Sequence, residues 1–205
     1  MYSKYISIVF VLIIMGISNY IAKSQSNINI KLTTLSYQFS DNNIELVNRK
    51  IGESGKLAFE PGLIFAYESF ATPATSIKVA MSLYYDKASK LAGFPQVMVR
   101  FRIFNAYKHS MSMGIGPALY FRQSWSTIEG YEDDGVYTDT GDWQYKMAWL
   151  SGELEYNYYL SKNSNLSVSL NLINPESLGL AIGYKYWISK KPKRKRGCIS
   201  CPNFH

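Results

Sequence analysis

The stretch NLSVSLNL, residues 165–172, alternates strictly between small polar and apolar residues. In an extended chain the three leucines and Val168 share one face, and the serines and asparagines share the other. This period of two predicts a β-strand with one apolar and one polar face. After Gln25, no stretch sustains the 3.6-residue period of an amphipathic helix.

The same alternation recurs along the chain and predicts eight strands. Only the first segment changes phase, near Thr33 and Thr34, where we expect a β-bulge. The predicted strands are 28–39, 57–67, 77–85, 95–104, 111–121, 148–160, 165–172 and 178–188.

The connectors between these segments mostly alternate between long and short. The long ones are 40–56, 86–93 and 124–142, and the short ones surround Pro73, Tyr107 and residues 161–163, with a further short loop at 174–177. An even number of strands with long loops at one end and short turns at the other is typical of membrane barrels. A soluble barrel also alternates, but a narrow eight-stranded interior suits Gly, Ser and Ala better than Phe, Tyr and Leu. The pattern predicts an all-β fold, an eight-stranded antiparallel up-and-down transmembrane β-barrel.

The two ends of the chain differ in character from its middle. Residues 1–24 have the features of a signal peptide, with Lys4, the apolar run 6–17 and a small-x-small cleavage site at residues 22–24. That run is shorter than the roughly 20 residues that a spanning helix needs. We therefore expect a signal peptide at 1–24, an outer-membrane barrel at 25–189 and a basic, Cys-containing tail at 190–205.

The net charge of +7 comes from the ends. Residues 190–196 hold six basic residues, and the predicted signal peptide holds Lys4 and Lys23, which leaves 14 basic against 15 acidic residues between them. This middle part of the chain has no basic face for nucleic acid, so we expect no nucleic-acid partner. The 17 Tyr, 10 Phe and 4 Trp suit an apolar belt with aromatic girdles.

The last predicted strand carries a recognisable frame. Gly183, Tyr186 and Ile188 follow a G-x-x-aromatic-x-apolar order, which is similar to the terminal β-signal read by the outer-membrane insertion machinery. With the strand pattern, the mature chain resembles the small outer-membrane β-barrels, the class of OmpA-like and OmpX-like barrels. It departs from them by continuing for about sixteen residues after Ser189. The resemblance implies residence in the bacterial outer membrane, contact with its lipid and lipopolysaccharide, recognition by that machinery and a periplasmic tail.

Charged residues fall on the predicted polar faces. Inside a narrow lumen such charges must pair, because an unpaired buried charge is costly. We expect a network of charge pairs that plugs the barrel; the alternative is a narrow pore for small solutes. The residues are Lys31, Glu60, Glu68, Lys78, Arg100, Arg102, Arg122, Glu153, Glu155 and Lys185.

One cluster raises an enzymatic alternative. His109 stands near Ser110 and Ser112, and a His with a Ser could serve a lipid-modifying barrel enzyme. The connector pattern places His109 on a periplasmic turn, without an orienting carboxylate, and we predict no catalytic residues. We predict neither a metal nor a cofactor.

The loop 124–142 and the tail carry the remaining distinctive groups. The loop holds six acidic residues and no Lys or Arg; without EF-hand spacing, we expect a solvated surface loop rather than a calcium site. In the tail we expect a local disulfide between Cys198 and Cys201, with a zinc site that adds His109 and His205 as the alternative. The basic run would contact anionic headgroups or dock on a periplasmic or envelope protein. The sequence predicts a non-enzymatic barrel with a structural or accessory-subunit role in the cell envelope.

Overall fold

The structure, a computed structural model, describes residues 25–39, 49–51, 56–131, 135–173 and 177–189. The predicted signal peptide and tail, with Cys198 and Cys201, lie outside these residues. Within the described part, eight long strands form the molecule, with two short strands and one 3-10 helix, η2 (Trp125–Thr127), at one end. The long strands are β1 (Gln25–Gln38), β3 (Leu57–Phe70), β4 (Thr75–Tyr85), β5 (Leu91–Ala106), β6 (His109–Gln123), β8 (Trp143–Tyr159), β9 (Ser164–Ile173) and β10 (Ser177–Trp187), and the short ones are β2 (Lys50–Ile51) and β7 (Thr138–Asp139).

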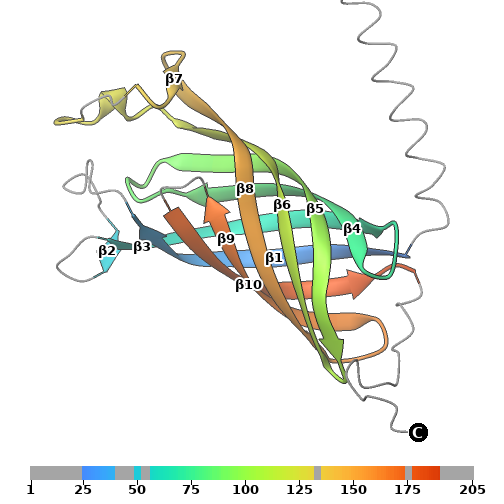
Figure 1. Cartoon of the computed structure of the whole chain (residues 1–205). Coiled ribbons are helices and arrows are strands. Elements are labelled where there is room, and N and C mark those ends of the chain that lie inside the picture. Colours follow the sequence, from blue (N-terminus) through green and yellow to red (C-terminus); the bar gives the residue numbers. More distant parts are fainter. Residues whose placement is uncertain (1–24, 40–48, 52–55, 132–134, 174–176, 190–205) are drawn as a thin grey trace, which may run out of the picture.

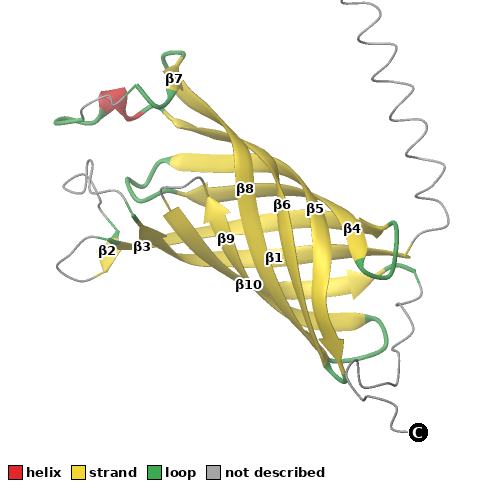
Figure 2. Ribbon diagram, viewed as in Figure 1, coloured by secondary structure: helices red, strands yellow, loops and turns green. Residues whose placement is uncertain are grey.

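The long strands close into a barrel (Figures 1 and 2). They follow one another in the order β1-β10-β9-β8-β6-β5-β4-β3, and β1 also pairs with β3. Each pairing is antiparallel. Every long strand therefore has two neighbours, and the sheet has no open edge among them.

The predicted eight-stranded antiparallel fold is confirmed, including the bulge in the first strand. The register of β1 shifts between Thr33 and Leu35 against both β10 and β3. The expectation that only the first strand changes phase is wrong, because the register also shifts between Arg102 and Phe104 of β5 and between Gly116 and Ala118 of β6. Opposite the shift in β6, Trp149 and Leu150 of β8 are both exposed, so the alternation changes phase there. This change explains why β8 begins at Trp143 rather than at the predicted residue 148.

The two faces of the barrel have opposite polarity. On β9, Leu170 is 39% exposed on the outside, whereas Ser169 is 1% exposed on the inside. Across the described residues the exposed large side chains of the strands are mostly Ile, Leu, Val, Phe and Tyr, and buried positions include many Ser, Asn, Lys and Glu. An apolar exterior around a polar interior is the polarity of a transmembrane barrel. Among the described residues, no helix is long and apolar enough to cross a membrane.

The two ends of the barrel also differ. At one end, which we call the turn end, β1 begins, β10 ends and the connectors are short (71–74, 107–108 and 160–163). The opposite loop end has the connectors 39–56, 86–90, 124–142 and 174–176, and Figure 1 shows β2, η2 and β7 there. This asymmetry agrees with the predicted long and short connectors.

Candidate functional site

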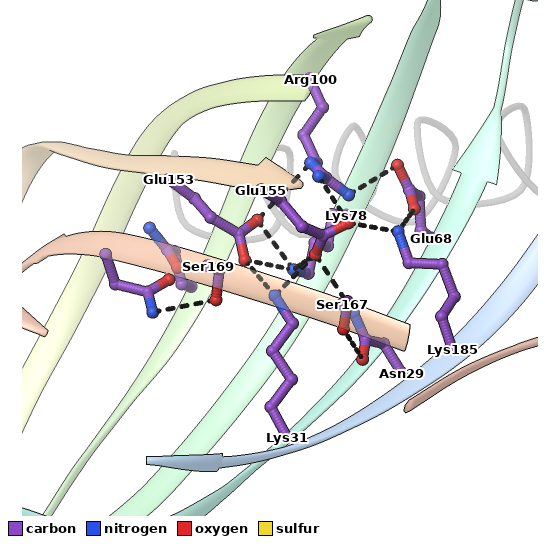
Figure 3. A network of polar contacts seen from close by, with 12 residues as sticks. Asn29, Lys31, Glu68, Lys78, Arg100, Glu153, Glu155, Ser167, Ser169 and Lys185 are labelled. Carbon is purple, nitrogen blue, oxygen red and sulfur yellow. Dashed lines mark hydrogen bonds and ion pairs between the residues drawn. The ribbon is translucent and has the colours of Figure 1, made fainter. Parts of the chain in front are cut away.

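Seven charged side chains meet inside the barrel (Figure 3). They come from six strands, and each residue is at most 4% exposed. Glu153 and Glu155 lie two positions apart on β8, so both point to the lumen side of the same strand. We call this set the lumen network: Lys31 of β1, Glu68 of β3, Lys78 of β4, Arg100 of β5, Glu153 and Glu155 of β8, and Lys185 of β10.

The two glutamates of β8 bind lysines from β1 and β4. The Nζ of Lys31 donates to Glu153 Oε1 at 2.7 Å and to Glu155 Oε2 at 2.6 Å. The Nζ of Lys78 lies 2.7 Å from Glu153 Oε1 and 3.4 Å from Glu155 Oε2. Each lysine therefore links both carboxylates across the lumen.

Arg100 and Lys185 connect the same glutamates to Glu68. Arg100 Nη1 lies 2.8 Å from Glu68 Oε1, and its Nη2 lies 2.9 Å from Glu155 Oε1. Lys185 Nζ lies 3.1 Å from Glu68 Oε2 and also donates to Glu155 Oε1. Glu155 thus contacts all four cations of the lumen network.

Neutral side chains supply further donors to these carboxylates. Asn27 Nδ2 donates to Glu68 Oε2 at 3.0 Å, and Asn29 Nδ2 donates to Glu155 Oε2 at 3.2 Å. Ser76 Oγ donates to Glu68 Oε1 at 2.6 Å. We had not predicted these partners, although the alternation of Asn27 and Asn29 with Ile28 would have identified them as lumen residues.

The charges of the lumen network nearly balance. Four cations and three carboxylates leave a formal charge of +1 in the buried set. Desolvating each ion is costly, and the cost is offset only where every ion has good partners. Since each carboxylate contacts at least two cations, the set acts as one unit rather than as separate pairs.

The structure places three predicted lumen residues away from this network. Arg102 lies towards the turn end, with its guanidinium carbon 5.0 Å from the centre of the Phe70 ring. Glu60 lies near the loop end, where it accepts a hydrogen bond from the backbone N–H of Lys87 at 3.1 Å. Arg122 lies next to the end of β6. Glu60 and Arg122 lie at the loop-end termini of β3 and β6, whereas Glu68, Lys78 and Lys185 of the network lie close to the turn end.

At the loop end, the 3-10 helix η2 folds its aromatic residue inward. Trp125 is 2% exposed, and its Nε1–H donates to Asp86 Oδ2 at 2.7 Å. The other oxygen of Asp86 accepts from the backbone N–H of Ala88 and of Lys90. Burial raises the pKa of Asp86 despite these hydrogen bonds. The guanidinium carbon of Arg122 lies 4.1 Å from the centre of the Trp125 ring.

His109 and its two neighbouring serines do not form a cluster. The imidazole Nδ1 contacts the hydroxyl of Tyr156, which lies on the outer face. Ser110 and Ser112 are at most 8% exposed and face the lumen side instead. The period of two separates His109 from Ser110, and His109 lies at the turn end, as expected from the connectors.

The residues of the predicted insertion signal lie on β10 and just beyond it. Tyr186 and Ile188 are exposed on the outside. A Cβ atom at Gly183 would lie 2.2 Å from the backbone oxygen of Ile30 and 2.5 Å from the Cα of Lys31. Glycine is therefore required where β10 passes Lys31, which gives this residue a packing role besides the predicted one.

The acidic loop is described only in part, because residues 132–134 lie outside the described ranges. Asp139 accepts hydrogen bonds from Ser124 and from the backbone of Gly141, and these lower the pKa of its carboxyl. Over the residues that the structure describes, no three His, Cys, Asp or Glu side chains are arranged to hold a metal ion.

Comparison with known proteins gives a likeness of fold. No family model and no curated protein matches the chain. Solved structures do match, among them the N-terminal β-barrel domain of Pseudomonas aeruginosa OprF, with 9% identity, a TM-score of 0.47, and 81% of this chain and 100% of that chain covered. Ail of Yersinia pestis shows 13% identity and a TM-score of 0.46 over 80% of this chain and 99% of its own. Neisserial surface protein A shows 9% identity and a TM-score of 0.46 over 80% and 96%.

Removing one carboxylate tests how strongly the lumen network stabilises the barrel. E155Q leaves four buried cations with two carboxylates, and we expect it to lower the free energy of unfolding by about 3–5 kcal/mol, because each of the four buried cations loses one of its carboxylate partners. The measurement is urea-induced unfolding from lipid vesicles, followed by tryptophan fluorescence.

Two variants serve as controls for E155Q. E129Q changes the same charge at an exposed position and should shift stability by no more than about 0.5 kcal/mol. The double variant E155Q/K185M removes a cation as well and should recover part of the loss. Equal destabilisation by E129Q and E155Q would contradict the importance of the network.

Proposed function

We propose that the protein is a non-conducting, non-enzymatic barrel of the bacterial outer membrane that serves as a structural or accessory element of the cell envelope. The observation that carries this proposal is the lumen network, in which seven buried charged side chains from six strands contact one another across the interior. The apolar outer face and the asymmetry of the two ends support residence in a membrane.

A closed lumen follows from the physics of this network. Eight strands leave an interior little wider than the side chains that fill it. A passing ion would have to displace Lys31 or Lys78 from carboxylates at 2.6–2.8 Å. Because that would leave buried charges without partners, we infer that the lumen network plugs the barrel.

The arrangement around His109 favours a non-enzymatic barrel over a lipid-modifying enzyme. A general base must lie within hydrogen-bond reach of the group it activates. His109 contacts Tyr156 on the outer face, whereas Ser110 and Ser112 face the lumen. Ser110 and Ser112 are therefore on the wrong side of β6 to be activated by His109.

Planar-bilayer recordings test the closed lumen. The intact protein should show no discrete conductance steps, because the network blocks ion passage. A variant that replaces two facing pairs by alanine (Lys78, Glu153, Arg100 and Glu68) keeps the net charge of the lumen at +1 and should open it, giving measurable steps.

The alanine variant also controls for failed insertion, since its steps demonstrate that inserted barrels are detectable. Discrete steps from the intact protein would contradict the proposal and support the narrow-pore alternative. Folding of both proteins is verified by their shifted migration in electrophoresis without heating.

The proposed role as an accessory subunit is based on the tail, residues 190–205. Its six basic residues and Cys198–Cys201 spacing go beyond what strand closure requires, because β10 already ends at Trp187. Mild-detergent purification of the intact protein and of a chain truncated after Ser189 should give associated envelope proteins only with the intact chain. The same partners with both chains would exclude docking through the tail.

A further inference from the structure

A polar cavity of about 80 Å³ opens at the loop end of the barrel. Its walls include the aromatic rings of Tyr84, Tyr120, Trp125 and Tyr137. This volume holds several water molecules, since a cavity needs only about 10–15 Å³ for each. It therefore suits a ligand, or the head of a larger ligand, with a few non-hydrogen atoms.

Two buried carboxylates line this cavity. Glu60 of β3 is 8% exposed and Asp86 of the β4–β5 connector is 5% exposed. Glu60 accepts hydrogen bonds from two neutral donors, the backbone N–H of Lys87 and the hydroxyl of Ser36. Asp86 accepts from the Trp125 indole and from two backbone N–H groups.

The cations that line the cavity lie against its aromatic wall. The guanidinium carbon of Arg122 lies between two rings, 4.1 Å from the centre of Trp125 and 3.9 Å from that of Tyr137. Lys87 Nζ lies 5.4 Å from the centre of the Trp125 ring. Arg122 also donates to Gln144 Oε1 at 2.8 Å. Both cations lie beside Trp125, and the charge of Lys87 also attracts Glu60, which lines the cavity from β3.

A second observation points to a ligand beside Glu60. Glu60 and Tyr84 also line a smaller cavity of about 10 Å³, which includes Ser82. Ser82 is 0% exposed, and its hydroxyl has no hydrogen-bond partner within the described residues. Buried polar groups without partners are rare in folded proteins, and those that occur call for a specific explanation.

We propose that the loop-end cavity binds a small primary ammonium group, with Glu60 as its counter-ion. Three N–H donors suit the acceptors that line this cavity: the carboxylates of Glu60 and Asp86 and the hydroxyl of Tyr84. Ser82 borders the smaller cavity that shares Glu60 and Tyr84 with it. The rings of Tyr84 and Tyr120 add attraction for a cation. An anion is disfavoured here, because it would lie beside the carboxylates of Glu60 and Asp86.

Titration of methylammonium chloride into the folded full chain in detergent micelles tests this site. Trp125 lines the cavity, so its fluorescence should change saturably at pH 8 and constant ionic strength. E60Q should weaken binding at least tenfold, because it removes the counter-ion. The matched variant E129Q, at an exposed position in the same end of the barrel, should bind as the intact protein does.

Further measurements locate the signal and guard against misfolding. W125F should lose the fluorescence change, and tetramethylammonium, which has no N–H donor, should bind more weakly than methylammonium. If E60Q does not fold, Y84F replaces it and should weaken binding because an acceptor is lost. Unchanged affinity in E60Q, or in Y84F where that variant is used, overturns the proposal. So does a response of the intact protein that sodium chloride reproduces.

Discussion

Charges inside this barrel depend on partners that also lie inside it, because the outer face is apolar and the lumen is narrow. Lys31, Lys78, Arg100 and Lys185 meet this requirement through three carboxylates that they share. The constraint extends to neutral residues, since Asn27, Asn29 and Ser76 point inward and donate to the same oxygens. It also reaches the backbone: Gly183 lets β10 pass close to Lys31.

The strands could be predicted from the sequence, because their signal is local. Alternation with period two located eight strands, and its change of phase located the bulge near Thr33. At Trp149 and Leu150 the phase changes with no polar residue between the two outward side chains. The predicted strand therefore begins at residue 148, whereas β8 begins at Trp143. A bulge with two outward apolar residues looks like a break in the strand when only the sequence is available.

The partners within the lumen could not be predicted in the same way. Lys31 and Glu153 are 122 residues apart, and their contact depends on how far each strand is staggered around the barrel. Alternation assigns Glu60, Arg102 and Arg122 to the polar face, but it does not give their height along the barrel axis. Their height places Glu60 and Arg122 at the loop-end cavity and Arg102 beside Phe70. The loop-end cavity is therefore a consequence of how the strands are staggered around the barrel.

We propose that one face of each strand meets lipid while the other lines a closed, polar lumen. Spin labels on single cysteines at positions 166, 170 and 172 of β9, with Cys198 and Cys201 replaced by Ser, test this arrangement in lipid vesicles. Collision with oxygen, which concentrates in lipid, should be frequent at these outward positions, and collision with a water-soluble nickel complex should be rare. A label at Ser169 should be shielded from both. Frequent collision with the nickel complex at position 170 would contradict the account, because that face would then be in contact with water.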